Sequence, residues 1–424
     1  MAKTARFAID IGPLKKYRDF RYLWSSGLIS NLGSMITYVA IPFQIKELTH
    51  SYLAVGISGA VELVPLIVFG LYGGVLADAV DRKKMTWTTE AAALLATSTL
   101  LINSLQGRPS VLLIYVVAGL FAAVDGMQRP SANAILPRIV GHSDLPAASA
   151  LLSLRSQFGM IVGPAIGGVI ISSVSVSAGY GVDVITFLIS LGLLWKVGAV
   201  PPNEKADKPS LSALFAGLKY AVSRQDLLGT YLIDLAAMFF AMPNALFPFW
   251  ADHINAPWAL GFFYAAGTVG AIVMTLTSGW ISSYRFHGRA IIIAAVGWGA
   301  AIALAGVVHS LVWVLLFLAI AGASDMVSAL FRSSIWNQTI PDELRGRLSG
   351  IELLSYSVGP LAGQLRAASI ASATSLSFSV TSGGVMCIGM VILLAGFLPK
   401  FRKYDVKTNE FAAAERKKRE SLNE

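Results

Sequence analysis

The chain has 424 residues, of which 55% are hydrophobic and only 13% are charged. Soluble domains carry about 25% charged residues, so a soluble enzyme of this size would expose far too much apolar surface. A membrane-spanning helix uses about 20 mostly apolar residues, and twelve such helices would use about 240. We therefore expect a multi-pass membrane protein. Its net charge of +9 should reflect orientation in the membrane rather than nucleic-acid binding.

Long apolar segments alternate with short polar loops along the whole chain, which predicts an all-α membrane protein with twelve transmembrane helices. The first six spans are expected at 20–45, 52–77, 86–105, 110–131, 146–173 and 178–198. The other six are expected at 226–250, 258–283, 289–308, 311–332, 348–371 and 377–399. The first twenty residues lack the apolar core and cleavage site of a removable signal peptide, so the first span is expected to act as its own insertion signal.

A polar stretch separates the two groups of spans. We expect an N-terminal six-helix bundle at 1–200, a cytoplasmic linker at 201–225, a C-terminal six-helix bundle at 226–400 and a cytoplasmic tail at 401–424. Within the linker, Leu211 to Ser223 has apolar residues at helical spacing and is expected to lie along the membrane surface. The tail is basic and polar, so we expect it to be solvated or to contact headgroups.

The basic residues are distributed on one side of the predicted spans. All but four of the 33 Lys and Arg residues fall in the termini or in loops on the side of the termini. The exceptions are Lys46 and Arg108 in opposite loops, and Arg155 and Arg366 inside spans. Since basic loops stay in the cytoplasm, we expect a plasma-membrane protein with both termini cytoplasmic.

Two short motifs recur at about half the length of the chain. RPSANAILP, from Arg129, resembles RSSIWNQTIP, from Arg332, and GPAIGG, from Gly163, resembles GPLAGQ, from Gly359. Parallel repeats of this kind occur in one large class of transporters. They predict two pseudo-symmetric six-helix bundles.

The loop after the second span, GVLADAVDRKK at 74–84, resembles the signature loop of the major facilitator superfamily. Ala79 stands in place of a common basic residue, and Asp81 stands in place of a common glycine. The resemblance implies a conformational latch formed by Gly74, Asp78, Arg82 and Lys83. A merely basic cytoplasmic loop would explain the cations, but not the glycine and the first aspartate at their spacing.

The fifth span contains a glycine-proline motif whose members are Gly159, Gly163, Pro164, Gly167 and Gly168. It resembles the motif typical of drug:proton antiporters of this superfamily, although Ala150 stands where the longer form has another glycine. Small residues four apart let a second helix approach closely, and a proline frees a backbone carbonyl. Ordinary tight helix packing explains the same residues, and the two interpretations overlap.

Four segments are similar to the bacterial exporter branch that contains the enterobactin (siderophore) exporter and drug efflux pumps. They are FRYLWSSGLISNLGSM, GGVLADAVDRKKM, GFFYAAGTVGA and IPDELRGRLSG. The last segment places Arg345 and Arg347 before the eleventh span as an expected cytoplasmic anchor. The resemblance implies the major facilitator fold and secondary active export, and it leaves the substrate open.

Ionisable residues inside spans cost roughly 2.5–3.5 kcal/mol each on insertion scales, so each is a functional candidate. The candidates for proton coupling or the substrate cavity are Glu62, Asp125, Asp325, Asp234 and Arg155. Glu62 comes first because it lies near the middle of its span with no basic residue nearby in sequence. Asp125 with Arg129, and Asp325 with Arg332, share a helix face, so a structural ion pair is the alternative role for either aspartate.

Further residues inside spans have simpler interpretations. Asp183 and Asp234 could bond only backbone or hydroxyl groups, whereas Glu90 and Glu352 lie near span ends, where headgroups could receive them. The candidate aromatic lining of a substrate cavity is Tyr38, Phe239, Phe240, Phe247, Trp250 and Tyr264. Helix packing is the alternative role for each of them.

Several chemical signatures are missing from the sequence. It has no GxxxxGK[ST] phosphate loop, its five histidines are scattered singly, and Cys387 is its one cysteine. No nucleophile-base arrangement is recognisable. We therefore expect neither an enzyme nor a metal or organic cofactor, and the proton gradient is the expected energy source.

The sequence thus predicts a secondary active transporter that works by alternating access. We expect proton-coupled efflux of amphipathic small molecules such as drugs by a monomer in the lipid bilayer, without nucleic-acid partners. The first alternative is a siderophore exporter of the enterobactin-exporter type, with Arg155 or Arg366 contacting an anionic cargo. A transporter-like sensor, a lipid scramblase and a membrane-embedded enzyme are the alternatives from other classes.

Overall fold

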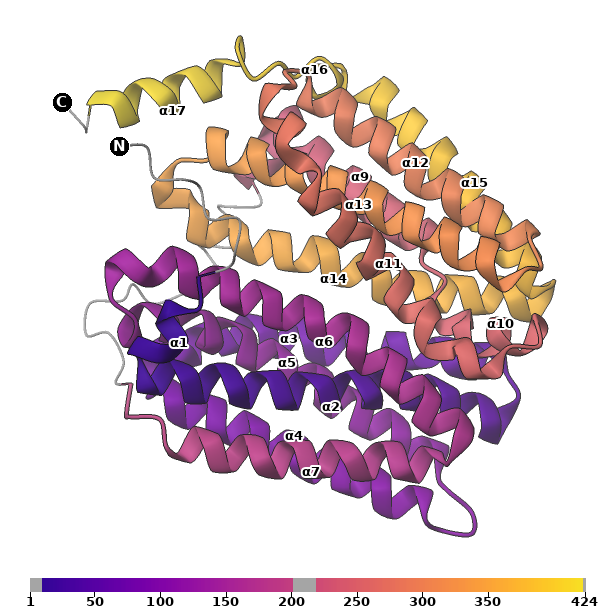
Figure 1. Ribbon diagram of the computed structural model, residues 1–424. Helices are drawn as coiled ribbons and strands as arrows, with labels where there is room; N and C mark the ends of the chain where they lie inside the picture. The colour runs from indigo at the N-terminus through magenta and orange to yellow at the C-terminus, as the bar shows by residue number, and fades with distance from the viewer. Residues whose placement is uncertain (1–9, 201–218, 422–424) are drawn as a thin grey trace. The chain divides into compact units, whose positions relative to one another are not determined.

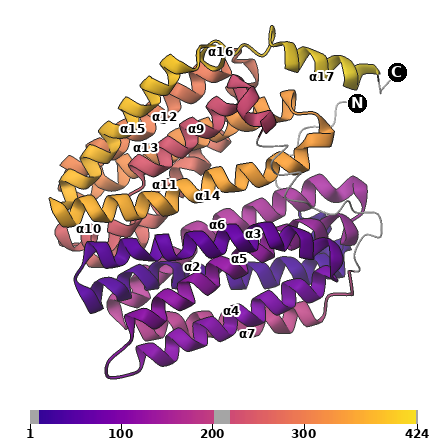
Figure 2. The same cartoon turned by 180° about the vertical axis from the view of Figure 1, so that it is seen from behind.

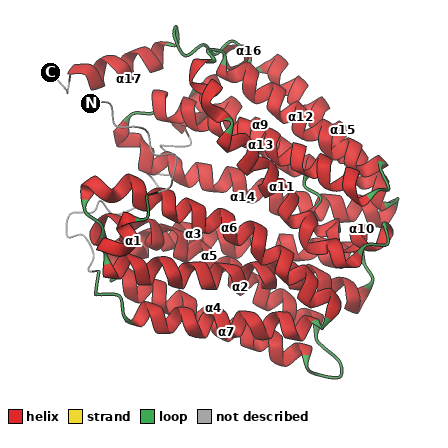
Figure 3. Ribbon diagram, in the orientation of Figure 1, coloured by secondary structure: helices red, strands yellow, loops and turns green. Residues whose placement is uncertain are grey.

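The computed structural model describes residues 10–200 and 219–421. Within these ranges, the side chains of 71–79, 129–134, 342–343, 345–347 and 349–354, and of positions 282, 356, 419 and 421, lie outside the described part. The regular structure of the described residues is entirely helical (Figure 3). Most of the expected linker falls on 201–218 and so lies outside the described residues, whereas 219–223 is helical.

Each expected span of the first half corresponds to one helix (Figure 1). The elements are α1 (Gly12–Lys16), α2 (Arg18–Thr49), α3 (Tyr52–Ala79), α4 (Arg82–Ser104), α5 (Val111–Ile139), η1 (His142–Asp144), α6 (Leu145–Ser173) and α7 (Val176–Trp195). Three of them begin at a side-chain cap, because Asp81, Ser110 and Ser175 each accept a hydrogen bond from a backbone amide of the first turn. The predicted boundaries of these spans differ from the helix ends by a few residues.

The second half contains more breaks than expected. Its elements are α9 (Gln225–Ala241), η2 (Asn244–Leu246), α10 (Phe247–His253), η3 (Pro257–Ala259), α11 (Leu260–Leu276), η4 (Ser278–Ser283), α12 (His287–Val307), α13 (Leu311–Thr339), α14 (Asp342–Ala373), α15 (Leu376–Phe397), α16 (Pro399–Arg402) and α17 (Glu410–Ser421). The expected span 226–250 is interrupted because Pro243 disfavours helical geometry at Met242, which is extended. Pro248 then lies in the first turn of α10.

Ten segments of the described residues are long and apolar enough to cross a membrane. The helices at the expected spans 86–105 and 348–371, α4 and α14, are not among the ten. In α4 the reason is a polar face that includes Thr86, Thr89, Glu90 and Thr97, all of which are buried. A helix with such a face exposes its apolar side outward and encloses its polar side among its neighbours.

The chain divides into two compact units. Unit 1 contains the described residues of 1–48, 64–208 and 258–265, and unit 2 contains those of 49–63, 209–257 and 266–424. The first part of α3 therefore belongs to unit 2, and the first part of α11 belongs to unit 1. Each unit is described by itself below.

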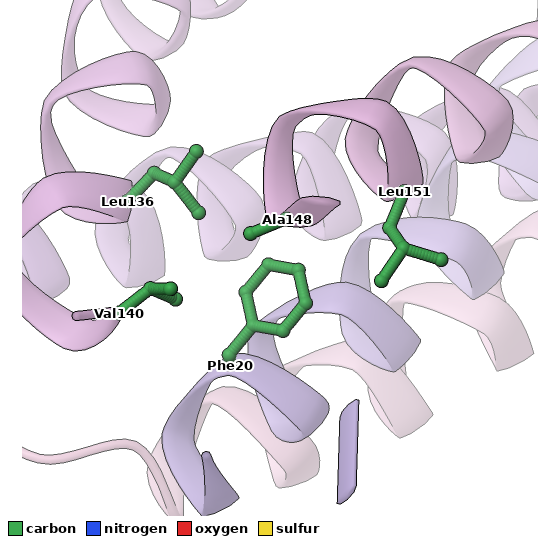
Figure 4. Packing of buried hydrophobic residues seen from close by; sticks show 5 residues of the cluster. All are labelled: Phe20, Leu136, Val140, Ala148 and Leu151. Carbon is green, nitrogen blue, oxygen red and sulfur yellow. The ribbon is translucent and has the colours of Figure 1, made fainter. Parts of the chain in front are cut away.

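Unit 1 packs around α2 and α4. The α4 helix lies against α5 and α7, and these helices run side by side in both views (Figures 1 and 2). At one end, Phe20 of α2 is fully buried between Leu136 and Val140 of α5 and Ala148 and Leu151 of α6 (Figure 4). This cluster fixes the spacing of three helices that also carry polar groups described below.

Unit 2 packs around α9 and α12. The α12 helix lies between α13 and α15, and α9 lies against α14 and α15 (Figure 2). The C-terminal segment also packs on this unit, because Phe401 and Tyr404 are only 0% and 2% exposed. A side chain at Gly229 of α9 would overlap the Phe401 ring, and one at Gly288 of α12 would overlap the Phe401 carbonyl. The expectation that the tail is solvated or contacts headgroups is therefore wrong for Phe401 and Tyr404.

Candidate functional site

Glu90 forms the first polar centre of unit 1. This side chain of α4 is 5% exposed. Its Oε1 accepts hydrogen bonds from Ser30 Oγ of α2 and Gln128 Nε2 of α5, both at 3.1 Å, and its Oε2 accepts one from Ser190 Oγ of α7, also at 3.1 Å. The expectation that Glu90 faces headgroups is therefore wrong. Its carboxylate joins four helices inside the unit.

Asp183 of α7 forms the second polar centre and is 0% exposed. Its Oδ2 accepts hydrogen bonds from Thr37 Oγ1 of α2 at 2.5 Å and from Thr97 Oγ1 of α4 at 3.2 Å, and Thr186 Oγ1 lies 3.2 Å from its Oδ1. A side chain at Gly33 of α2 would overlap Asp183 and Thr186. The site is possible because α2 approaches α7 closely at this glycine. The partners of Asp183 are hydroxyl groups, as the sequence suggested.

Arg155 of α6 brings a positive charge to the same unit. Its Nη1 donates to the Leu23 carbonyl of α2 at 3.4 Å, and its buried Nε has no hydrogen-bond partner. Its charge interacts with that of Glu90, although the two groups form no ion pair within 4.0 Å among the residues described. A side chain at Gly27 would overlap the guanidinium. Arg155 is thus held between α6 and α2 with spare hydrogen-bonding capacity.

An ion pair between Asp234 and Arg332 forms the polar centre of unit 2. Asp234 of α9 and Arg332 of α13 are 4% and 8% exposed at the side chain. Ser355 Oγ of α14 donates to Asp234 Oδ2 at 3.2 Å. Arg332 Nη2 also lies 3.7 Å from Asp325 Oδ1, because both residues lie on one face of α13. The expected pairing of Asp325 with Arg332 is present, but the guanidinium of Arg332 lies closer to Asp234 than to Asp325.

Aromatic residues flank this ion pair. Tyr231, one turn before Asp234, stacks on Trp336, one turn after Arg332, with ring centroids 5.5 Å apart. Trp336 Nε1 donates to Thr230 Oγ1 at 2.9 Å. The stacked rings and their hydrogen bond connect α9 to α13 beside the charges.

Arg366 of α14 is the second basic side chain that the sequence places inside a span. Its Nε donates to the Phe239 carbonyl of α9 at 3.1 Å, and its buried Nη1 has no hydrogen-bond partner. A side chain at Gly383 of α15 would overlap the guanidinium. No carboxylate among the described residues pairs with Arg366. Like Arg155, it bonds a backbone carbonyl and keeps unused donors.

Two more of the predicted acidic residues lie on α3 and α5. Glu62 is half-buried on α3 in unit 2, and Asp125 is half-buried on α5 in unit 1. The side chains of Arg129 and Glu352 lie outside the described part. The expected pairing of Asp125 with Arg129 and the expected position of Glu352 near headgroups therefore remain predictions.

The predicted cavity aromatics have different surroundings. Phe247 and Trp250 are 4% and 1% exposed and lie against one another, with centroids 6.3 Å apart. In unit 1, Tyr38 meets Tyr264 edge to face at 5.4 Å. The neighbouring rings Phe239 and Phe240 are also edge to face, at 5.0 Å. The buried pair is placed for helix packing, whereas Tyr38 is 41% exposed.

The predicted latch is described only in part. Gly74 and Asp78 lie in the last turns of α3, and their side chains are outside the described part. Arg82 is buried, and Lys83 Nζ donates to the Trp195 carbonyl at 3.1 Å.

Asp81 does more than the sequence indicated. It caps α4 through Lys84 N at 3.1 Å, and its Oδ2 accepts from Val200 N at 3.1 Å, which connects α4 to the segment after α7. The side chains of Arg345 and Arg347, the expected anchor, are also outside the described part.

The glycine-proline motif brings α6 close to α2. A side chain at Gly159 would overlap Asn31 of α2. One at Gly163 would overlap Met35 and crowd the Leu32 carbonyl, and one at Gly167 would crowd Ile36. These three glycines are spaced four apart and lie on one face of α6. On another face, Gly168 and the Pro164 carbonyl lie against Gly261 of α11, inside unit 1. The motif therefore places backbone against backbone at two contacts.

The described residues contain no group of three His, Cys, Asp or Glu side chains that could hold a metal ion. Each unit brings together ionisable side chains that are buried or half-buried. In unit 1 these are the buried Glu90 and Asp183 and the half-buried Arg155, and in unit 2 they are the buried Asp234 and Arg332 and the half-buried Asp325 and Arg366. Buried charges inside membrane helices are typical of substrate and ion pathways.

Known proteins with related sequences are transporters. A family model described as "Transmembrane secretion effector" matches residues 9–421. The enterobactin exporter EntS of Shigella boydii serotype 18 is 28% identical over 392 residues, which cover 91% of this chain and 94% of the exporter. The enterobactin exporter EntS of Escherichia coli O81 has the same identity and coverage.

Solved structures with a similar fold are also transporters. A POT family transporter in complex with a thioalcohol-conjugated peptide has a TM-score of 0.72 at 13% identity, covering 91% of this chain and 96% of that one. The nucleoside transporter NupG has a TM-score of 0.71 at 12% identity, covering 91% and 99%. At these identities the likeness shows the fold. The chain therefore belongs to the transmembrane secretion effector family of the major facilitator superfamily, in the enterobactin exporter branch, and it is a multi-pass membrane transporter of small molecules and not an enzyme.

Proposed function

We propose that this transporter exports a siderophore of the enterobactin type, an anionic catecholate, by alternating access. The sequence favoured drugs first and siderophores second, but the names of the relatives support the opposite order. We further propose that twelve helices cross the plasma membrane as two bundles, at 1–200 and 226–400, in a monomer with both termini cytoplasmic. In this arrangement α4 and α14 also cross the membrane, and with the ten apolar segments they make twelve spans.

The observation that carries the proposed cargo is the state of Arg155 and Arg366. Each guanidinium is half-buried inside a helix bundle, donates to a backbone carbonyl and keeps a buried N–H group without a partner. A buried donor without an acceptor costs about 1–3 kcal/mol. An anionic oxygen of the cargo would remove that cost. A cationic drug would instead be repelled by these two side chains.

We expect Arg155→Gln and Arg366→Gln each to lower siderophore export about tenfold or more, because a hydrogen bond to a charged group contributes about 1.5–3 kcal/mol. Uptake of a catecholate siderophore into everted vesicles measures this, normalised to the amount of folded protein. Arg138→Gln, which removes an exposed guanidinium from α5, is the matched control and should transport normally. Full export by both buried variants would contradict the proposed cargo contacts.

We also propose that the proton gradient drives this export. The support is the number of carboxyl groups inside the bundles, among them Glu62, Asp125, Asp234 and Asp325, which the sequence predicted for coupling. Glu62 remains our first candidate, since it lies half-buried on an apolar helix. A group that takes up and releases a proton as the site changes sides would couple the two fluxes.

We expect Glu62→Gln to abolish the response of export to the proton gradient, because the amide cannot exchange a proton. The measurement compares cargo uptake into everted vesicles before and after an ionophore collapses the gradient. Glu410→Gln, at an exposed position of α17, is the control and should keep the response. If the wild type itself ignores the ionophore, proton coupling is wrong; if Glu62→Gln alone still responds, the coupling group is another carboxylate.

A further inference from the structure

A basic groove lies at one end of unit 2, away from the buried charges. It has a volume of about 370 Å³ and is lined by Arg289, Ile292 and Ile293 of α12 and by Arg402 and Lys403 at the end of α16. Three of these five side chains are cationic, and none is acidic. The groove therefore combines a cluster of positive charge with an apolar wall.

The C-terminal segment holds the cations of α16 beside α12. Phe401 is fully buried against Gly229 and Gly288. Tyr404 is also buried, and its ring stacks on His287 with centroids 5.9 Å apart. These anchors flank Arg402 and Lys403 on both sides in sequence, so the two exposed cations are fixed next to Arg289, the residue that follows Gly288.

The acidic residue nearest in sequence to Lys403 has a partner of its own. Asp405 forms an ion pair with Arg285, and the hydrogen bond from Arg285 holds the pKa of Asp405 below its ordinary value. Arg289 lies over the Phe286 ring at 4.9 Å from its centroid, and no carboxylate of the described residues forms an ion pair with it. The groove thus presents three basic side chains and no acidic one.

The apolar wall points outward from the bundle. Ile293 is 67% exposed, and it lies in the second turn of a helix apolar enough to cross the membrane. In a membrane transporter, an exposed isoleucine at this depth meets acyl chains, whereas cations at the end of the same helix meet headgroups. The groove spans the boundary between these two layers.

We propose that this groove binds an anionic phospholipid, with its phosphate between Arg289, Arg402 and Lys403 and an acyl chain along Ile292 and Ile293. Clusters of basic residues next to a membrane helix attract anionic headgroups, and each Lys or Arg contributes about 1 kcal/mol. Arginine also binds phosphate through two parallel hydrogen bonds. A free phosphate ion shares the headgroup chemistry but cannot use the apolar wall. The site is independent of the exported cargo.

The test titrates the purified full-length chain with phosphatidylglycerol, phosphatidylcholine or inorganic phosphate, and native mass spectrometry counts the bound molecules. We expect phosphatidylglycerol to bind about tenfold or more tightly than phosphatidylcholine, and inorganic phosphate to bind weakly. The triple variant Arg289→Gln/Arg402→Gln/Lys403→Gln should lose that preference. Equal binding of the two lipids, or binding of phosphate as tight as that of phosphatidylglycerol, would overturn the proposal.

Two further variants make the test specific. Lys407→Gln/Arg416→Gln/Lys417→Gln removes the same charge from exposed positions of the C-terminal segment and should keep the preference; an equal loss would mean general surface attraction instead of a site. Ile293→Ser removes the apolar wall without changing charge. It should weaken phosphatidylglycerol binding and leave phosphate binding unchanged, and an unaltered lipid affinity would refute the acyl contact.

Discussion

Replacing Arg332 by glutamine is expected to destabilise the transporter by about 3–5 kcal/mol, since it leaves a buried carboxylate without its counter-charge. Asp234 and Arg332 are 4% and 8% exposed at the side chain. Asp325, at 3.7 Å from the same guanidinium, also loses its partner. The larger cost falls on Asp234, because the side chain of Asp325 is 39% exposed. The free energy of unfolding in detergent and the amount of folded protein in the membrane measure this effect.

A double-mutant cycle separates the ion pair from general damage to α13. Asp234→Asn/Arg332→Gln removes both charges and leaves side chains of similar volume, so we expect a smaller loss than the sum of the two single variants. Arg138→Gln, at an exposed position of α5, should change stability little. Strictly additive losses in the cycle would show that the two charges do not depend on one another.

The second large effect is expected at Gly163, where a single methyl group should cost about 1–3 kcal/mol by overpacking. The Cβ of alanine would overlap Met35 and would lie 3.0 Å from the Leu32 carbonyl. The overlapped atom of Met35 is its Cβ, which no side-chain rotation can move, and the carbonyl belongs to the α2 backbone, so the two helices must separate. Separation would also strain the contacts of Arg155 with α2, and we expect export to fall with stability.

Gly192→Ala provides the matched control because it adds the same methyl group to α7, where nothing lies within 4 Å of the added atom. Alanine is the better helix former, so this variant should be neutral or slightly more stable. Thermal unfolding of both variants in the same detergent gives the comparison. Equal behaviour of Gly163→Ala and Gly192→Ala would mean that α6 does not depend on close contact with α2.

The helices themselves were predictable because apolar run length and loop polarity are local properties of the sequence. The interruption after Ala241 was missed, although Pro243 and Pro248 signalled it. Both prolines lie within a run that is apolar enough to span the membrane, and hydropathy alone does not register a broken helix. The expected number of twelve spans and the cytoplasmic termini remain predictions.

The polar centres were harder to predict, because they depend on helices far apart in the chain. The shared face of Asp325 and Arg332 was visible from their spacing, whereas the shorter contact with Asp234 requires the packing of α9 against α13. Glu90 was placed at the headgroups from its position near a span end. A better signal was the repeated threonines of α4, which indicate a polar face that needs burial.

The arrangement of Phe401 on α9 and α12 has a consequence for biosynthesis. A chain is made from its N-terminus, so the surfaces at Gly229 and Gly288 enter the membrane region long before the residues that cover them exist. Unit 2 can therefore reach its final packing only after Phe401 and Tyr404 have been synthesised. A chain that lacks Phe401 and Tyr404 would leave these surfaces of α9 and α12 uncovered.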